Sequence, residues 1–457
     1  MSGHVYDDGD LAVPGGCAGP VQRVIVIGAG ISGLAVGNAL THAGVECLVL
    51  EARDRMGGRL HTVDVGGVPI DLGGSWIHTP VGNPLRRFAD QAGVECRDGN
   101  PLYETVGYDS TEGRRLSDAE LGALMEMHDG FPEAHDELLE VLGPTASAAE
   151  GIDRFVAGSG LDGADARRAR LLLRQAVAAE AADTPERQSL RWLWNEAEYD
   201  GDFLGDVPVG GYRRLTEALA EGVSVRLGAE VSSIEVSATG VLVATKDGGV
   251  ESCSHAVVTV PLGVLKRGSV RFAPELPDDR RAAIDRLGFG SFEKIAVSFD
   301  SPFWRDASVP HLLAFPRDDA SILIIGQDAF GAGPALVGLV GADNCGHLLG
   351  RSPDAADWML RIIGEAIGRP CPEPTAIAVS SWTTDPYAGG AYAHNTPASS
   401  PADVDLLGEP LGGRLLFAGE ATTTTRMGFA DGAFQTGIRE AKRLLRQPAV
   451  SLAVWRG

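Results

Sequence analysis

A glycine-rich turn early in the chain has the residue types and spacing of a dinucleotide phosphate site. Gly28, Gly30 and Gly33 follow the β-branched run Arg23–Ile27 and open the helical stretch Leu34–Ala43. Gly28 allows a tight turn off a strand, Gly30 lets backbone approach a pyrophosphate, and Gly33 permits close helix–strand packing. The N-terminus of the helix supplies the anion site. The turn therefore predicts dinucleotide binding.

A carboxylate stands where the ribose of such a ligand is expected. The second strand, Glu46–Leu50, ends at Glu51, which lies 23 positions after Gly28. A carboxylate there accepts hydrogen bonds from ribose hydroxyls and disfavours a 2′-phosphate, so NADP is not expected. Together these elements make a complete βαβ beginning, which predicts a parallel sheet buried on both faces.

One lysine lies in a segment that otherwise has the composition of a buried strand. Lys294 lies within Phe292–Val297, and the chain has only four lysines against 35 arginines. Burying an ammonium costs several kcal/mol of desolvation free energy, so nearby hydrogen-bond acceptors must offset about this amount. We therefore interpret Lys294 as a functional residue.

Further motifs resemble a known enzyme family. The stretch Glu51–Arg59 ends in a Gly-Gly-Arg turn that resembles the second FAD-contacting loop of two-domain flavin oxidoreductases. The segment Asp71–His78, followed by Gly82-Asn83-Pro84, resembles polyamine oxidases and their lysine-demethylase relatives. The similarity continues through the segments 207–212, 259–266, 381–392 and 417–422. The chain is therefore identified as similar to FAD-dependent amine oxidases of the flavin monoamine and polyamine oxidase type.

This resemblance implies that FAD is the cofactor. Monoamine oxidases bond the flavin through a Cys at the position of Ala391, so FAD is expected to be non-covalent here. The residues that should contact FAD are Gly28, Gly30, Ser32, Gly33, Glu51, Arg53, Gly58, Arg59, Gly74, Ser75, Trp76, Val231, Gly419, Glu420, Phe429 and Ala430. Arg59 should face a phosphate or the flavin edge, and Glu420 should bind the ribityl chain or order the pyrophosphate loop.

Five residues are expected at the reacting centre by the same resemblance. Lys294 matches a lysine that holds a water against the flavin N5, which implies a role in reoxidation by O₂. Tyr392 matches one wall of an aromatic cage, and Trp382 should pack near the flavin. Phe429 falls where several relatives have the second cage tyrosine, so this chain keeps the apolar wall and loses the hydroxyl. His78 is expected to orient the substrate amine or to serve a proton path.

The fold class that the resemblance implies is α/β, with two interleaved domains. We expect a Rossmann-like FAD-binding domain over residues 21–82, 205–288 and 404–448, a mixed-sheet and helical substrate domain over 83–204 and 289–403, and disorder over 1–20. Apolar spacing predicts helices over much of 115–200, including 164–182 and 189–198.

Composition limits the partners. Lys and Arg total 39 and Asp and Glu total 62, for a net charge of −23, which repels nucleic acid and anionic lipid and suits cationic substrates. The six cysteines show no metal-ligand spacing and are too sparse for a disulfide scaffold, so we expect no metal and a reducing, cytoplasmic location. No apolar run is long enough for a membrane span, and a homo-oligomer is compatible with the sequence.

The expected reaction is oxidation of a primary or secondary amine to an imine, which water hydrolyses to an aldehyde, with O₂ reduced to H₂O₂. Polyamines are the leading class, with Glu196, Glu198 and Asp200 as candidate anchors for distal cations, although a solvated acidic face is the favoured interpretation of these three residues. An L-amino-acid oxidase, which needs an arginine for the substrate carboxylate, remains an alternative. So do a lysine demethylase, although its usual helical insertion and partner domain are not expected here, and a flavin-binding interaction protein without turnover.

Overall fold

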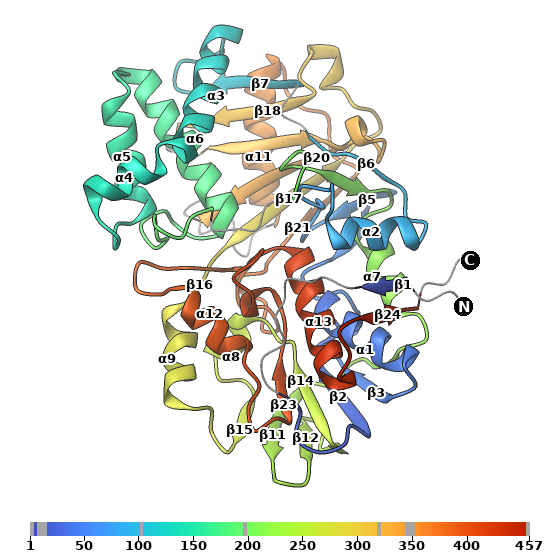
Figure 1. Ribbon diagram of the computed structural model, residues 1–457. Coiled ribbons are helices and arrows are strands. Elements are labelled where there is room, and N and C mark those ends of the chain that lie inside the picture. The colour runs from blue at the N-terminus through green and yellow to red at the C-terminus, as the bar shows by residue number, and fades with distance from the viewer. Residues whose placement is uncertain are drawn as a thin grey trace.

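Two large sheets lie in opposite halves of the molecule (Figure 1). The structure is a computed structural model that describes residues 4–6, 16–100, 104–194, 199–317, 321–342 and 352–453. In Figure 1 the half that carries the smaller of the two sheets mixes blue, yellow-green and red ribbon, so segments far apart in the sequence build it together. The architecture is mixed α/β.

The first sheet is parallel and has five strands in the order β10-β3-β2-β14-β23. Its strands are β10 (Ser224–Arg226), β3 (Glu46–Leu50), β2 (Arg23–Ile27), β14 (His255–Val258) and β23 (Leu415–Phe417). Val24 and Val26 of β2 pack toward α1 (Ile31–His42) and α13 (Ala430–Leu445), whereas Ile25 and Ile27 pack toward a four-stranded sheet. That sheet consists of β13 (Val250–Cys253), β12 (Val241–Thr245), β11 (Val231–Val236) and β15 (Arg271–Ala273). A strand covered on both faces needs apolar residues at every position, which accounts for its uninterrupted apolar run.

The second sheet has seven strands in the order β21-β17-β20-β19-β18-β7-β8. Its strands are β21 (Ala376–Val379), β17 (Phe292–Ser298), β20 (Ala335–Gly341), β19 (Ile322–Gly326), β18 (His311–Phe315), β7 (Thr105–Asp109) and β8 (Arg114–Arg115). On one face α11 (Ser352–Ile367) packs against Leu312 and its neighbours. On the other face Leu313 joins the core of the helices α3 (Asp118–Glu133), α4 (His135–Leu142), α5 (Ala148–Gly158) and α6 (Gly163–Ala181).

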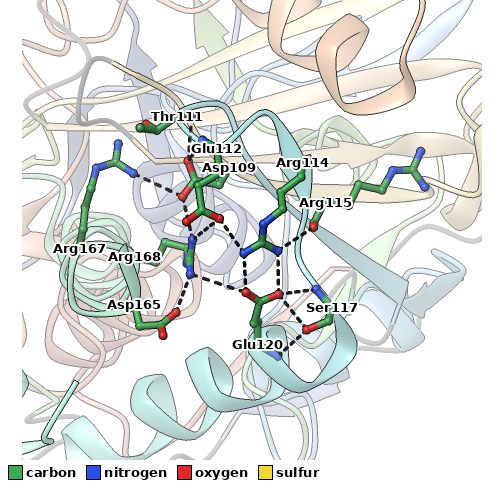
Figure 2. A network of polar contacts seen from close by, with 10 residues as sticks. All are labelled: Asp109, Thr111, Glu112, Arg114, Arg115, Ser117, Glu120, Asp165, Arg167 and Arg168. Atoms are coloured by element: carbon green, nitrogen blue, oxygen red, sulfur yellow. Dashed lines mark hydrogen bonds and ion pairs between the residues drawn. The ribbon is translucent and has the colours of Figure 1, made fainter. Parts of the chain in front are cut away.

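An ion network fastens α6, through Arg168, and α3, through Glu120, to the β7–β8 hairpin (Figure 2). Arg168 of α6 is 2% exposed and contacts Asp109 of β7 at 2.9 Å and Asp165 at 2.5 Å. Asp109 also accepts backbone N–H groups from Thr111 and Glu112. A buried guanidinium is tolerated because several oxygens satisfy its donors. The network therefore fixes α3 and α6 relative to the sheet.

Smaller elements complete the fold. They are β1 (His4–Tyr6), β4 (Thr62–Val65), β5 (Val68–Asp71), α2 (Pro84–Gln91), β6 (Cys96–Asp98), β9 (Asp206–Pro208), α7 (Arg213–Ala220), α8 (Leu262–Lys266), α9 (Asp278–Arg286), β16 (Gly288–Phe289), β22 (Ala393–His394), α12 (Pro401–Gly408) and β24 (Val450–Leu452). Among the described residues, no helix combines the length and the apolarity that crossing a bilayer requires. The division into two interleaved domains stays a prediction.

Two sequence expectations differ from the structure. Residues 191–194, within the helix expected over 189–198, form a turn, because Ser189 is held in an antiparallel bridge with Ser147 and the backbone before the turn is therefore extended rather than helical. Residues 195–198 lie outside the described residues. Within the segment 1–20, where we expected disorder, β1 pairs antiparallel with β24.

Candidate functional site

A cavity of about 690 Å³ draws its lining from both large sheets. Gly28 and Glu51 enter it from the ends of β2 and β3, and Lys294 and Leu339 enter it from β17 and β20. All of the residues expected to bind the cofactor or to act in the reaction line this cavity except Gly33. The structure thus brings together groups that are far apart in the sequence.

The glycine turn forms an open cradle at the start of α1. Gly28 has φ +107°, and a Cβ there would lie 2.7 Å from Thr259 Oγ1. A Cβ on Gly33 would lie 2.0 Å from the Gly28 carbonyl oxygen, so Gly33 serves the packing of helix on strand. A Cβ on Gly30 would meet nothing within 4 Å, and no side chain caps the helix there. The first-turn N–H groups are therefore available to an anionic ligand that approaches the backbone closely.

Glu51 binds the turn and also reaches the cavity. One carboxylate oxygen accepts the Ala29 N–H at 2.7 Å, and the other accepts the Arg53 N–H at 2.9 Å. Each oxygen keeps a second acceptor position, which is the capacity that a pair of ribose hydroxyls requires. Val231 lies nearby in the lining. This part of the cavity therefore offers the groups that a phosphate and a ribose would require.

Arg59 and Glu420 form an ion pair that joins two loops of the lining. Arg59 Nη1 lies 2.7 Å from Glu420 and also donates to the Ala391 carbonyl at 2.6 Å. The second oxygen of Glu420 accepts the Ala393 N–H at 3.2 Å. Glu420 is buried, and the Arg59 guanidinium offsets the desolvation of its carboxylate. Sequence reasoning assigned the two residues separately to a cofactor and did not foresee the pair.

Lys294 is buried among oxygen acceptors. Its Nζ donates to the Gly73 carbonyl at 2.5 Å, to Ser75 Oγ at 2.5 Å and to the Asp71 carbonyl at 3.2 Å, and it lies 5.3 Å from the centre of the Trp76 ring. These contacts supply the hydrogen bonds that a buried ammonium requires. Burial lowers the pKa of Lys294 to about 8, against the opposing attraction of Asp71. Lys294 is therefore a cation that gives up its proton readily.

Aromatic side chains surround this end of the cavity. The Tyr392 hydroxyl donates to the Ala179 carbonyl of α6. Trp382 is buried and donates to the Leu72 carbonyl at 2.8 Å. Phe429 is the N-cap residue of α13 and lies edge-on to His78 at 5.1 Å. Tyr392 and Trp382 are thus held by hydrogen bonds to the surrounding backbone, and Phe429 packs against the His78 ring.

His78 is fixed in one tautomer. Its Nδ1 lies 2.6 Å from the Phe203 carbonyl oxygen, and because a carbonyl only accepts, Nδ1 carries the proton. Burial lowers the pKa of His78 to about 4, so the ring is neutral near pH 7. In a neutral ring with Nδ1 protonated, Nε2 acts as an acceptor. His78 can therefore accept a hydrogen bond from an amine in the cavity.

Three residues behind His78 were missed as site residues. Asn83 donates to the His78 carbonyl at 2.9 Å and to Asp431 at 3.1 Å, and Asp431 pairs with Arg426 at 2.8 Å. The sequence signal was the Gly82-Asn83-Pro84 turn, where Asn83 also caps α2 by accepting the N–H groups of its first turn. The buried Arg426 and Asp431 are far from His78 in the sequence and come close to it only in the folded chain. No sequence motif therefore pointed to them as site residues.

Apolar residues of α3 and α6 line the far part of the cavity and were also missed. Their helical spacing predicted a core face and nothing about a ligand. Of the candidate anchors, Glu196 and Glu198 lie outside the described residues, and Asp200 pairs its backbone with Val81. Across the described residues, no group of three His, Cys, Asp or Glu side chains could hold a metal ion.

Comparison with known proteins places the chain among flavin enzymes. Residues 31–445 match the family model described as flavin containing amine oxidoreductase. Lysine-specific histone demethylase 1 homolog 2 of Arabidopsis thaliana is 34% identical over 93% of this chain and 59% of its own length. Polyamine oxidase 4 of Oryza sativa subsp. japonica is 32% identical over 95% of this chain and 91% of its own length. Protein FLOWERING LOCUS D of Arabidopsis thaliana is 34% identical, and the chain covers 55% of it. The chain spans 52–59% of the length of three of the demethylase relatives that it matches.

Proposed function

Because the chain belongs to the family of flavin containing amine oxidoreductases, whose cofactor is FAD, we propose that it oxidises a primary or secondary amine at the expense of O₂. The amine loses two electrons and two protons to become an imine, and water hydrolyses the imine to an aldehyde and an amine or ammonia. O₂ takes up the two electrons and two protons and leaves as H₂O₂. One observation carries the proposal: a single cavity holds the glycine cradle of α1 together with Lys294, Tyr392 and Phe429.

The residues of this cavity fit FAD. Gly30 leaves open space beside an uncapped helix N-terminus, and Glu51 offers ribose acceptors. FAD supplies acceptance of a hydride equivalent and its delivery to O₂. No cysteine lines the cavity within the described part of the chain, so we propose that FAD is held without a covalent bond.

The protein's own groups would bind, orient and exclude water. The rings of Tyr392 and Phe429 give the amine a flat, apolar passage, which favours its neutral form. The Nε2 acceptor of His78 can take an N–H of the amine and so orient it. Lys294 places a positive charge where negative charge develops during the reaction with O₂.

The charged lining supports an amine over an amino acid. An amino-acid substrate needs a cation for its carboxylate. Among the described residues, the arginines of the lining are Arg53, which pairs with Asp385 at 2.6 Å, and Arg59, which pairs with Glu420. Both guanidiniums are already matched by carboxylates. The L-amino-acid oxidase alternative therefore lacks an evident anchor in the described cavity.

Polyamines are the first class to test. The sequence predicted them, and the rice relative that the chain nearly spans is called a polyamine oxidase. The demethylase names of other relatives keep methylated lysine side chains as a second candidate class, supported by identities of 32–34% over the shared length. We further propose the two interleaved domains with the boundaries given above, activity in the cytoplasm, and no nucleic-acid partner, on the basis of the net charge of −23 and the sparse cysteines.

An anaerobic titration tests the proposal. The flavin-loaded protein is mixed with spermine, spermidine, putrescine, N-acetylated polyamines, benzylamine, a dimethyl-lysine peptide and L-amino acids, and bleaching of the flavin absorbance is followed before O₂ is admitted. We expect bleaching by at least one amine and peroxide on aeration. Bleaching by amino acids alone would replace the amine assignment, and bleaching by nothing in a wide panel would favour a flavin-binding protein without turnover.

A further inference from the structure

The cavity continues from Lys294 along a row of leucines. In the antiparallel register of the seven-stranded sheet, Lys294 of β17 pairs with Leu339 of β20, Leu339 pairs with Leu323 of β19, and Leu323 pairs with Leu313 of β18. Directly paired residues point to the same face of a sheet, and all four side chains line the cavity. Three strand spacings separate Lys294 from Leu313, which is about 14 Å. The sheet thus gives the cavity an apolar floor that starts at the proposed reaction centre.

Two helical stripes form the roof over this floor. From α6 the lining residues are Leu172, Leu173, Gln175, Ala176, Val177, Ala179 and Glu180, and from α3 they are Leu121, Met125, His128, Phe131 and Pro132. Spacings of three, four and seven residues keep the α3 set on one face of its helix, whereas the α6 set covers about half of the circumference of its helix. The α6 stripe runs from Leu172 to Glu180, which is eight helical steps or about 12 Å. Floor and roof therefore enclose an elongated space, which we name the side chamber.

The charged group of the side chamber lies at one end of the α6 stripe, whereas the neutral Gln175 lies in its middle and donates to the Leu339 carbonyl at 3.3 Å. Ala179, next to Glu180, accepts the Tyr392 hydroxyl, so this end lies at the aromatic walls. Leu171, next to Leu172, accepts the Ser321 hydroxyl beside β19, so the other end lies away from them. Glu180 is the one carboxylate among the described residues of the chamber, and it stands at the near end. The polar groups of α3 and β7 in the lining, His128 and Thr105, carry no negative charge.

We propose that the side chamber binds an uncharged, apolar arm of the substrate, so that the preferred amines are monoamines with a long alkyl or aryl-alkyl substituent. This inference rests on the proposed function and narrows its substrate class, placing monoamines ahead of the polyamines that the sequence predicted. A second ammonium group carried to the far end would lose its hydration without meeting a counter-charge in the described lining, which is strongly unfavourable. An alkyl arm of the same length gains from leaving water at each methylene.

A series of amines tests the preference in the unmodified holoenzyme. From butylamine to octylamine, we expect the second-order rate constant of anaerobic flavin bleaching to rise about fourfold for each methylene that the chamber encloses. Octane-1,8-diamine should react at least about tenfold more slowly than octylamine, because its distal cation must be desolvated. A flat chain-length series, or a diamine that matches octylamine, would overturn the inference.

A charge placed in the roof should reverse the preference. Ala176 is half-buried and lines the chamber, so Ala176→Asp adds a carboxylate there, and Ala176→Asn is its uncharged match. We expect Ala176→Asp to improve the ratio of diamine to octylamine rates by at least about tenfold and Ala176→Asn to leave that ratio within about threefold. Equal ratios in the two variants would count against the chamber as the site of the arm. Flavin content and thermal stability show whether each variant is folded.

Calorimetric binding of alkanols separates this inference from the proposed function. Alkanols carry the same arm without an oxidisable amine, and their dissociation constants should fall about fourfold per methylene from butanol to octanol. If alkanols follow this series but no amine bleaches the flavin, the proposed function is wrong and the chamber still binds apolar arms. If an amine bleaches the flavin but the affinity for alkanols does not depend on chain length, the proposed function is supported and the chamber inference is wrong.

Discussion

Lys294 combines burial with neutral partners. Its three acceptors are two backbone carbonyls and the Ser75 hydroxyl, and none of them carries a full negative charge. A carboxylate partner would raise the pKa of the ammonium, whereas burial lowers it to about 8. The charge of this residue is therefore fully present near pH 7 and is lost in the weakly alkaline range. The same cavity surface would present it to O₂ during turnover.

Replacing Lys294 by Met should slow the reaction with O₂ more than the reaction with amine. The methionine side chain keeps the length and removes the charge, so stabilisation of developing negative charge is lost. We expect reoxidation of the reduced protein to slow by about a hundredfold, and anaerobic bleaching by amine to change less than about fivefold. Stopped-flow mixing with O₂ and with amine measures the two steps separately.

The pH dependence supplies the control for this variant. In the unmodified protein the reoxidation rate should fall as pH rises through about 8, because the protonated ammonium is the active form. Lys294→Met should show no such transition. A variant that slows both steps equally, or that keeps the transition near pH 8, would contradict the assignment.

At the scale of elements, two glycines of the turn after β2 have different roles: one allows close packing, and the other leaves room for a ligand. Gly33 packs against the Gly28 carbonyl, whereas Gly30 faces open space in the cavity. Gly33→Ala should destabilise the fold by about 1–3 kcal/mol, because its Cβ has no room. Gly30→Ala should leave the thermal stability of the flavin-free protein nearly unchanged and weaken flavin retention. The melting temperatures of both flavin-free variants, and then the flavin absorbance per protein after loading, test these expectations. An equal decrease in melting temperature in the two variants would contradict them.

The local sequence predicted the bounds of strands better than it predicted which strands lie side by side. The strands Arg23–Ile27 and Glu46–Leu50 are confirmed to the residue, because strands buried on both faces have uninterrupted apolar runs. The row from Lys294 to Leu313 was not predictable, since it depends on the order of strands separated along the chain. The helix expected over 189–198 was wrong over 189–194, the part that the structure describes, because Ser189 is held in a bridge with distant Ser147, which no spacing rule reveals.

In the candidate site too, residues of short motifs were predictable from the sequence, and contacts between distant segments were not. Motif residues such as Glu51 and Glu420 could be named from the sequence, because each belongs to a short segment with its own signature. The Arg59–Glu420 pair joins segments that are far apart in the chain, and so does the roof formed by α3 and α6. Such contacts arise only when the chain has folded, so they carry no local signal.

The buried network of Figure 2 should control the side chamber without controlling the cofactor. Arg168→Met leaves the buried Asp109 carboxylate without its closest cation, which costs about 3–5 kcal/mol. Loosening of α3 and α6 should then raise the KM for amine several-fold while flavin retention stays near normal. The matched control is Arg170→Met, whose exposed pair with Asp153 should contribute less than about 1 kcal/mol. Chemical denaturation and steady-state kinetics test both variants; comparable losses in the two would contradict the prediction.

At the scale of the whole molecule, which has a net charge of −23, four histidines are uncharged near pH 7. Burial lowers the pKa of His61, His78 and His311 to about 4, and that of His394 to about 3. Each pKa lies below the unfolded value of about 6.5, so the unfolded chain binds more protons between pH 4 and 6.5. These groups therefore reduce the free energy of unfolding as pH falls through that window. Asp71 acts in the opposite direction, because burial raises its pKa to about 6.

His311→Asn isolates one contribution to this acid sensitivity. Its Nδ1 accepts the Gly326 N–H at 3.2 Å, so protonation breaks that bond and adds a buried charge near Arg305. The amide oxygen of Asn can accept the same N–H and does not titrate, so stability near pH 7 should change by less than about 1.5 kcal/mol. Between pH 6.5 and 4 the variant should lose stability more slowly than the unmodified protein, by up to about 1.4 kcal/mol per pH unit. Denaturant unfolding at several pH values in that range measures the difference, and parallel curves for the two proteins would show that His311 already carries its proton in the folded state.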